Sequence, residues 1–496
     1  MLFFAAINAT NGIELWKTDG TTAGTVLVKD IYSGTNDSEP ERLTNVNGVL
    51  YFAARDGING NELWKSDGTA GGTVLVKDIF SSSASSGPGS LTNVNGVLFF
   101  AANNGTNGTE LWKSDGTTGG TVLVKDINTG ATGSAPTKLT NINGVLFFNA
   151  TDATNGYELW KTDGTVGGTV LVKDIYSGTN SSEPNGLTNV NGVLYFAANN
   201  GINGIELWKS DGTAGGTVLI KDINLGSGSS FPNYLTNDGI NGEELWKSDG
   251  TAGGTVLVKD IYLGTIGSSP SSLTNVNGVL FFTATDATNG AELWKSDGTA
   301  AGTVIVKDIR TGTTGSAPNN LTNVNGIIFF TANDGTNGIE LWKTDGTASG
   351  TVLVKDINTG SGSSNPGSLT NVNGVLFFSA TDATNGTELW KSDGTAAGTV
   401  IVKDIYSGTP SSSPFSLINV NGVLFFSAKN GTNGTELWKS DGTAGGTVLV
   451  KDIYSGTANS DPSRLTNVNG VLFFTAANAI NGIELWKTDG TLQVLF

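Results

Sequence analysis

The tryptophans are the first residues in this sequence whose spacing could serve a chemical purpose. Each lies in the same segment, Glu-Leu-Trp-Lys, which occurs eleven times. Aromatic rings spaced regularly over a surface could stack on sugar faces, as in a multivalent lectin. Large aromatic side chains also pack between repeats, with the indole N–H bonded to a carbonyl oxygen. The position of each ring between a leucine and a lysine favours this structural role. The tryptophans are Trp16, Trp64, Trp112, Trp160, Trp208, Trp246, Trp294, Trp342, Trp390, Trp438 and Trp486.

An aspartate follows each tryptophan in the segment Asp-Gly-Thr, and Asp67, Asp115 and Asp393 are candidate calcium ligands. Calcium takes roughly six to eight oxygen ligands, so several such groups would have to converge. Aspartate also bonds to its own backbone two residues on, and glycine supplies positive φ, which is typical of a tight turn. The sequence contains no EF-hand spacing. This favours the turn, with calcium as the candidate cofactor.

A Lys-Asp pair recurs near the end of each repeat, from Lys29-Asp30 to Lys451-Asp452. Adjacent residues on a strand face opposite sides. We expect these charges to protect an outer sheet edge from aggregation. Alternatively, they pair with the glutamate of Glu-Leu-Trp in a neighbouring repeat.

Several classes of chemistry are disfavoured by composition. The chain has no histidine and no cysteine, which removes the commonest general base and all thiolate chemistry. Each carboxylate recurs in the same surroundings, whereas an active site needs a pair with divergent pKa values. We therefore predict that the protein is not an enzyme. The net charge of −17 disfavours nucleic acid, and the sequence has no apolar stretch long enough to insert into a membrane.

A repeated unit must position these groups. Successive tryptophans are 48 residues apart, except that Trp208 and Trp246 are 38 apart. The short step has an identifiable cause, because Leu235-Thr236-Asn237 passes directly to Asp238-Gly239. Ten residues, which elsewhere form one strand and its turn, are missing there.

Each unit is predicted to contain four short strands. Asn-Gly pairs mark the first two turns, because a type I′ hairpin turn needs positive φ at both central positions. The second strand is apolar on both faces, which predicts that it is buried. In a representative unit the strands are Leu369–Val372, Val375–Ala380, Glu388–Lys391 and Thr399–Ile405, with turns at Asn373-Gly374, Asn385-Gly386 and Ser392–Thr395.

These features predict an all-β fold of tandem four-stranded antiparallel blades of 48 residues. Repeats of this length and strand content are typical of β-propeller blades. The array would form one β-propeller of about ten or eleven blades, two smaller propellers in tandem or an open blade array, with Leu492–Phe496 as a last strand. The chain is predicted to be a single repeat array, 1–496. Its units are about 1–42, 43–90, 91–138, 139–186, 187–234, 235–272 (one strand deleted), 273–320, 321–368, 369–416, 417–464 and 465–496.

The repeated sequence resembles a known family over essentially the whole chain. Glu-Leu-Trp-Lys-[Ser/Thr]-Asp-Gly-Thr, with Gly-Thr-Val-Leu-Val-Lys-Asp-Ile and Asn-Gly-Val-Leu-Phe-Phe, is similar to the bacterial ELWxxDGT repeat family. The resemblance implies propeller-like repeats of surface or secreted proteins, without an established catalytic site. The Ser-Asp-Gly-Thr turn also resembles the Asp-box turn of sialidase-like and sortilin-like blades, although here Asp and Gly are adjacent.

Together these observations predict a non-catalytic extracellular repeat protein for adhesion or multivalent ligand binding, with carbohydrate as a candidate ligand. The alternative is a structural subunit of an extracellular filament, sheath or coat. The expected partners are other copies of the chain or a cell-surface or extracellular ligand, without nucleic acid or membrane insertion. The expected location is extracellular or at the cell surface.

Overall fold

A computed structural model describes residues 1–19, 21, 23–232, 236–237, 239–480 and 482–489 of this chain. Its secondary structure is β-strand, and no helix occurs among these residues. None of them therefore forms a helix long and apolar enough to cross a membrane. The predicted last strand, Leu492–Phe496, lies outside the described residues. The all-β prediction is confirmed.

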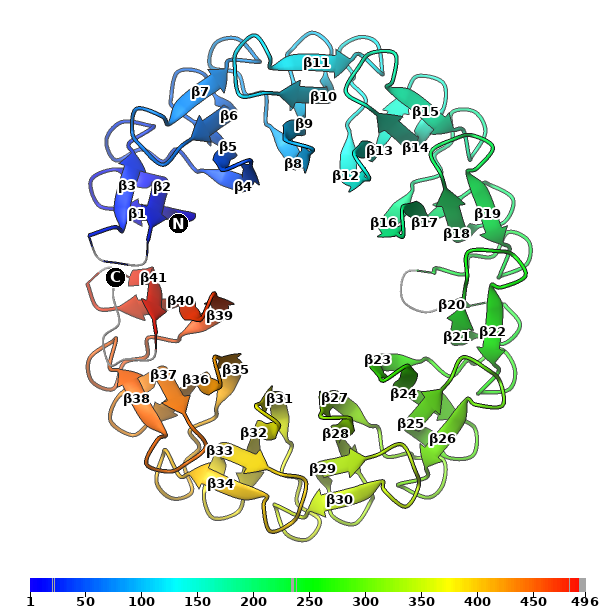
Figure 1. The fold of residues 1–496 in the computed structure, drawn as a ribbon, viewed down its shortest axis with the longest axis vertical. Helices are drawn as coiled ribbons and strands as arrows, with labels where there is room; N and C mark the ends of the chain where they lie inside the picture. Colours follow the sequence, from blue (N-terminus) through cyan, green and yellow to red (C-terminus); the bar gives the residue numbers. More distant parts are fainter. Residues whose placement is uncertain (20, 22, 233–235, 238, 481, 490–496) are drawn as a thin grey trace. The chain divides into compact units, whose positions relative to one another are not determined.

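The strands form tandem antiparallel sheets whose order follows the sequence. In the sheet drawn in yellow in Figure 1, β31 (Gly367–Val372), β32 (Val375–Asp382), β33 (Gly386–Ser392) and β34 (Val400–Lys403) lie in that order. Eight sheets have four strands and three have three strands within the described part of the chain. The blades predicted from the repeat are therefore present.

The other strands repeat this arrangement. Those before the short repeat are β1 (Leu2–Asn8), β2 (Gly12–Thr18), β3 (Val26–Lys29), β4 (Glu41–Val46), β5 (Val49–Arg55), β6 (Asn61–Ser66), β7 (Val74–Lys77), β8 (Gly89–Val94), β9 (Val97–Asn103), β10 (Thr109–Ser114), β11 (Val122–Lys125), β12 (Thr137–Ile142), β13 (Val145–Asp152), β14 (Gly156–Thr162), β15 (Val170–Lys173), β16 (Asn185–Val190), β17 (Val193–Asn199), β18 (Ile205–Ser210) and β19 (Val218–Lys221). The short repeat contributes β20 (Thr236–Asn237), β21 (Glu243–Lys247) and β22 (Val256–Lys259). Those after it are β23 (Ser271–Val276), β24 (Val279–Asp286), β25 (Gly290–Ser296), β26 (Val304–Lys307), β27 (Asn319–Val324), β28 (Ile327–Asn333), β29 (Ile339–Thr344), β30 (Val352–Lys355), β35 (Phe415–Val420), β36 (Val423–Asn430), β37 (Gly434–Ser440), β38 (Val448–Lys451), β39 (Ser463–Val468), β40 (Val471–Asn478) and β41 (Gly482–Thr488).

The chain is organised in two compact units. The first comprises Met1–Ile240 and Ser248–Val256, and the second comprises Asn241–Lys247 and Leu257–Phe496. Within each unit the first strands of successive sheets lie side by side: β4, β8, β12 and β16 in one, and β23, β27, β31, β35 and β39 in the other. The division falls in the short repeat, where the described residues between β20 and β21 form no strand.

Local turn chemistry explains how each sheet folds back on itself. Asn373 and Gly374 have φ angles of 52° and 85°, so the predicted type I′ turn is confirmed. The second turn works differently, because Asp382 Oδ1 accepts the backbone N–H groups of Thr384 (2.8 Å) and Asn385 (2.6 Å). The fourth strand is shorter than predicted and ends at Lys403.

The core lies between consecutive blades rather than within one sheet. Side chains alternate along β13, and Leu146, Phe148 and Ala150 pack on the preceding blade against Phe99 and Leu111. The residues between these three point to the other face of the sheet, and Phe147 packs in the cluster formed with the next blade. Both faces of the second strand are thus buried, as its apolar sequence predicted.

Candidate functional site

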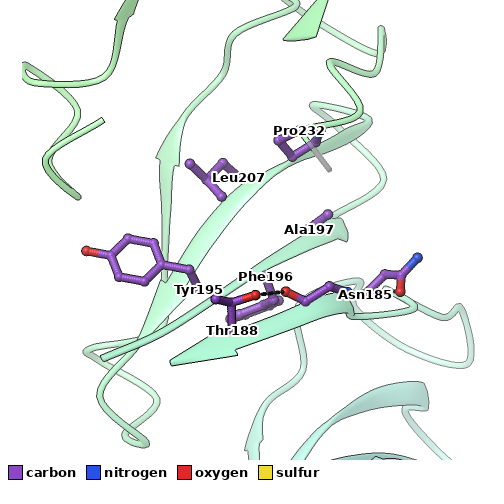
Figure 2. A pocket seen from close by; sticks show the side chains of 8 residues that line it. Asn185, Thr188, Tyr195, Phe196, Ala197, Leu207 and Pro232 are labelled. Carbon is purple, nitrogen blue, oxygen red and sulfur yellow. Dashed lines mark hydrogen bonds between the residues drawn. The ribbon is translucent and has the colours of Figure 1, made fainter. Parts of the chain in front are cut away.

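The candidate site is a hollow in the first unit. It has a volume of about 340 Å³ and lies over β16, β17 and β18. Figure 2 shows Thr188, Tyr195 and Asn185 along one side, with Leu207, Ala197 and Pro232 across from them. The hydroxyl of Thr188 donates to the carbonyl oxygen of Gly186 at 2.9 Å, which is the dashed line in Figure 2.

The hollow adjoins a sheet face whose counterparts in the second, third and fourth sheets are buried. We call Val190, Tyr195 and Leu207 the uncovered face. Val190 is 47% exposed, and the other two residues are partly exposed. Val94 and Leu111, at the positions of Val190 and Leu207 in the third sheet, are 5% and 0% exposed. The difference accords with the sequence, because the ten residues missing after Asn237 carry the Leu, Phe and Ala of a second strand in the other repeats.

Small side chains in this blade enlarge the hollow. In the preceding blade, Lys138 Nζ and Asn149 Nδ2 donate to the carbonyl oxygen of Pro184 at 3.0 and 2.6 Å. The same positions one repeat later hold Gly186 and Ala197. Neither residue has a side chain that could make the corresponding bond, so the space stays open.

The predicted tryptophans lie between blades. Trp160 is 5% exposed and belongs to the cluster that joins its sheet to the preceding one. The N–H of Trp208 donates to Ala198 O at 3.1 Å, whereas that of Trp64 has no hydrogen-bond partner among the described residues. These buried positions leave little ring surface for stacking on a sugar.

The lysine of the Lys-Asp pair also joins blades, but with partners that the sequence did not indicate. Lys125 Nζ lies 6.0 Å from the ring centroid of Trp160 and donates to Thr169 O at 2.8 Å. The same contacts recur for Lys77, whose Nζ lies 5.8 Å from the ring of Trp112. The alternative of pairing with a glutamate is therefore not seen for these lysines, which contact an aromatic ring and a carbonyl oxygen of the next blade instead.

The candidate calcium ligands Asp67, Asp115 and Asp393 lie in separate exposed turns. Asp67 Oδ1 accepts the N–H and hydroxyl of Thr69 at 2.8 and 2.7 Å. Hydrogen bonds from that hydroxyl and N–H lower the pKa of the Asp67 carboxyl. Among the residues that the structure describes, no three acidic groups converge to hold a metal. Calcium binding by these aspartates stays a prediction.

A buried glutamate fastens each connector to its blade, and the sequence reasoning missed this role. Glu62 is 0% exposed and accepts three strong bonds, from Ser86 Oγ (2.6 Å), Ser86 N (2.8 Å) and Ile79 N (3.0 Å). We call this arrangement the Glu–Ser clamp. A signal was available, because a serine recurs 24 residues after this glutamate within an otherwise variable connector.

Clamp burial predicts a pH dependence of stability. Burial raises the pKa of Glu62 to about 6 and that of Glu436 to about 7. Because these pKa values exceed the usual 4.5, the folded protein binds these protons more tightly than the unfolded chain does. The resulting contribution to the free energy of unfolding is fully present below pH 4.5 and is lost as pH rises toward 7. The turn aspartates have lowered pKa values, so their titration affects stability only at pH values below this window.

We expect the melting temperature to fall as pH rises from 4.5 to 7.5. Thermal unfolding monitored by circular dichroism at constant ionic strength measures it. Net charge contributes in the same direction. The variant Glu62→Gln separates the two effects, because it should flatten the part of the curve near pH 6. An unchanged profile in that variant would argue against the clamp as the titrating group.

Comparisons with known proteins bear on the fold. No protein-family model matches the chain, and no curated protein does. Among solved structures, a prolyl endopeptidase is 12% identical, with a TM-score of 0.32 and coverage of 73% of this chain and 49% of that one. The β-propeller domain of the Trilobed protease from Pyrococcus furiosus is 10% identical, with a TM-score of 0.29 and coverage of 73% and 96%. The GH74 enzyme of Niastella koreensis is 12% identical, with a TM-score of 0.26 and coverage of 100% and 93%. The chain thus spans about half the length of the matched prolyl endopeptidase.

These comparisons correct the function predicted from the sequence. We expected a non-catalytic extracellular protein for adhesion or multivalent ligand binding, or a structural subunit of a filament, sheath or coat. The solved structures that match include a prolyl endopeptidase, a puromycin hydrolase and a GH74 enzyme. That prediction was wrong. Tandem blades by themselves do not indicate a non-catalytic adhesive or structural protein.

Proposed function

We propose that this chain is a recognition protein that takes up one ligand at the hollow over β16–β18. The observation that carries the proposal is the uncovered face. The same positions are buried in the second, third and fourth sheets of the unit, whereas here Val190 is 47% exposed. An apolar surface beside a hollow with a few polar groups is the usual character of a binding site.

Binding, rather than catalysis at a repeated carboxylate, is the proposed role. The repeated glutamates are engaged in Glu–Ser clamps, as Glu62 is with Ser86. The repeated turn aspartates are engaged with their own threonines, as Asp67 is with Thr69. These bonds support a structural use of both sets.

The predicted location and repeat family are also parts of this proposal. The absence of cysteine, the acidity and the Gly/Asn/Thr-rich composition support an extracellular or cell-surface location. Membership of the ELWxxDGT repeat family also stays a prediction, supported by the recurring Glu-Leu-Trp-Lys-[Ser/Thr]-Asp-Gly-Thr segment.

The proposal is tested with the fluorescent dye 1-anilinonaphthalene-8-sulfonate on the full chain. We expect saturable dye binding that the variant Val190→Asp reduces, because a charge on the uncovered face disfavours an apolar ligand. Val166→Asp is the matched control, because Val166 is 65% exposed in a turn of the same unit. Equal dye binding by both variants and the wild type would refute the site.

A further inference from the structure

In ordinary joints between blades, an aromatic ring of the second strand lies against a turn glycine of the next blade. Phe281 meets Gly346 in this way, and Tyr51 meets Gly116. A Cβ atom at Gly346 would lie 3.0 Å from the ring of Phe281, and one at Gly116 would lie 2.3 Å from the Tyr51 hydroxyl. The ring and the glycine therefore fit each other closely.

The short repeat lacks this ring. Its ten missing residues correspond to Val46–Arg55 of the second repeat, which include Tyr51. The turn glycine of the following blade is Gly298, and the atoms nearest to a Cβ at that position are those of Lys247, at 3.7 and 3.8 Å. This joint thus keeps the glycine without its aromatic partner.

A pocket of about 210 Å³ lies at this glycine, and we call it the ring pocket. Leu245, Val258 and Leu280 form its apolar walls, and Lys247 and Gly298 also line it. All five residues belong to the second unit, so the pocket lies within one compact body.

The ring pocket reaches further into the joint than the groove of an ordinary joint does. That groove, about 180 Å³ beside Gly164, has Phe99 among its lining residues. In the ring pocket Leu280 is partly exposed, whereas Leu146 at the same position of another second strand is 0% exposed. The pocket therefore offers apolar surface that ordinary joints cover.

We propose that the ring pocket binds a small neutral phenol, in the space that a phenylalanine or tyrosine ring occupies in other joints. A dry apolar cavity of about 150 Å³ is large enough for benzene, so the ring pocket has room for one ring with a substituent. The site is separate from the hollow over β16–β18 and does not rest on the function proposed there.

The tyrosine joints indicate why the ring would carry a hydroxyl. Burial and the nearby Asp115 carboxylate raise the pKa of the Tyr51 hydroxyl at the next turn. The corresponding turn of the short joint carries Asp297, whose pKa is lowered by hydrogen bonds from Thr299 and, to a smaller extent, by the Lys247 ammonium. A neutral phenol would meet both charged groups, whereas an anion would be repelled by Asp297.

The second-strand rings of other blades are committed to their own sheets. Phe281 packs against the next blade at Gly346. Phe3 and Phe473 hold the same position in β1 and β40, whose backbones pair with β2 and β41. A pocket of this volume has no room for such a paired strand, so the occupant that fits is a separate small molecule.

Saturation-transfer-difference NMR of the full chain, with phenol as the probe, tests the site. We expect saturable binding that Leu280→Trp weakens roughly tenfold or more, because the larger side chain fills the pocket. Leu273→Trp is the matched control, since Leu273 is 51% exposed in the same sheet and does not line the pocket. Cyclohexanol should bind more weakly than phenol, because it lacks the aromatic face that attracts a lysine ammonium.

A second variant keeps the test decisive if Leu280→Trp loses its native circular dichroism spectrum. Lys247→Trp places a ring beside Gly298 from an exposed position, and it should weaken phenol binding as well. Absence of saturable binding, or binding that the folded variants retain unchanged, would overturn the ring pocket. Phenol binding lost in Val190→Asp alone would place the probe in the hollow over β16–β18 and also overturn it. Equal binding of phenol and cyclohexanol would refute recognition of an aromatic ring.

Discussion

Replacing Glu340 by alanine should lower the free energy of unfolding by about 2–6 kcal/mol. Glu340 is 0% exposed and accepts the backbone N–H groups of Ile357 (3.0 Å) and Ser364 (2.7 Å), besides the Ser364 hydroxyl. Alanine would leave both N–H groups buried without an acceptor, at roughly 1–3 kcal/mol each. Guanidinium denaturation followed by fluorescence measures the loss.

The neighbouring substitution Ser364→Ala is the control for this clamp. It removes the hydroxyl donor but leaves both N–H groups bonded to the carboxylate, so we expect a loss of about 0.5–1.5 kcal/mol. Amide hydrogen exchange at Ile357 and Ser364 should accelerate in the glutamate variant and change little in the serine variant. Equal losses in the two variants would contradict the clamp as described.

Phe330→Ala should cost about 3–5 kcal/mol, because it opens a cavity in a packed joint between blades. Phe330 is 0% exposed and clusters with Phe281 and Leu293 of the preceding blade and Trp342 of its own. The cost would appear as a lower denaturation midpoint. We expect the loss at this joint, since Phe329 on the other face of the same strand packs in a different cluster with the next blade.

The same substitution at Phe415 is the matched control, because Phe415 is 40% exposed and lies in the same unit. Its loss should stay below about 1 kcal/mol, as for ordinary surface changes. Similar costs at the two positions would mean that the joint does not depend on buried phenylalanine.

The strands and the first turn could be predicted from the sequence because their signals are local. Asn373-Gly374 specifies its own turn, and the apolar run after it specifies a buried strand. The Glu–Ser clamp joins residues 24 apart across a variable connector, and Lys125 meets Trp160 from another blade. Such contacts depend on how blades stack, which turn propensities do not determine.

The hollow illustrates the same limit. The sequence shows that ten residues are missing after Asn237, yet a deletion could equally have been closed by rearrangement of the neighbouring strands. The structure instead keeps β16–β18 as in other blades and leaves Val190 exposed. Gly186 and Ala197 enlarge the space, and neither glycine nor alanine carries a recognisable signal of a site.

The lysine that reaches forward to the next tryptophan gives the array a direction and a fixed step. Lys77 contacts Trp112, and Lys125 contacts Trp160, at the same interval along the chain. If recombination between the near-identical gene segments removed or added one whole period, every lysine would still meet an equivalent ring. Copy number can therefore drift at little structural cost. A loss of ten residues shortens the interval without breaking the contact between blades, because Lys221 Nζ still donates to Thr255 O at 2.8 Å.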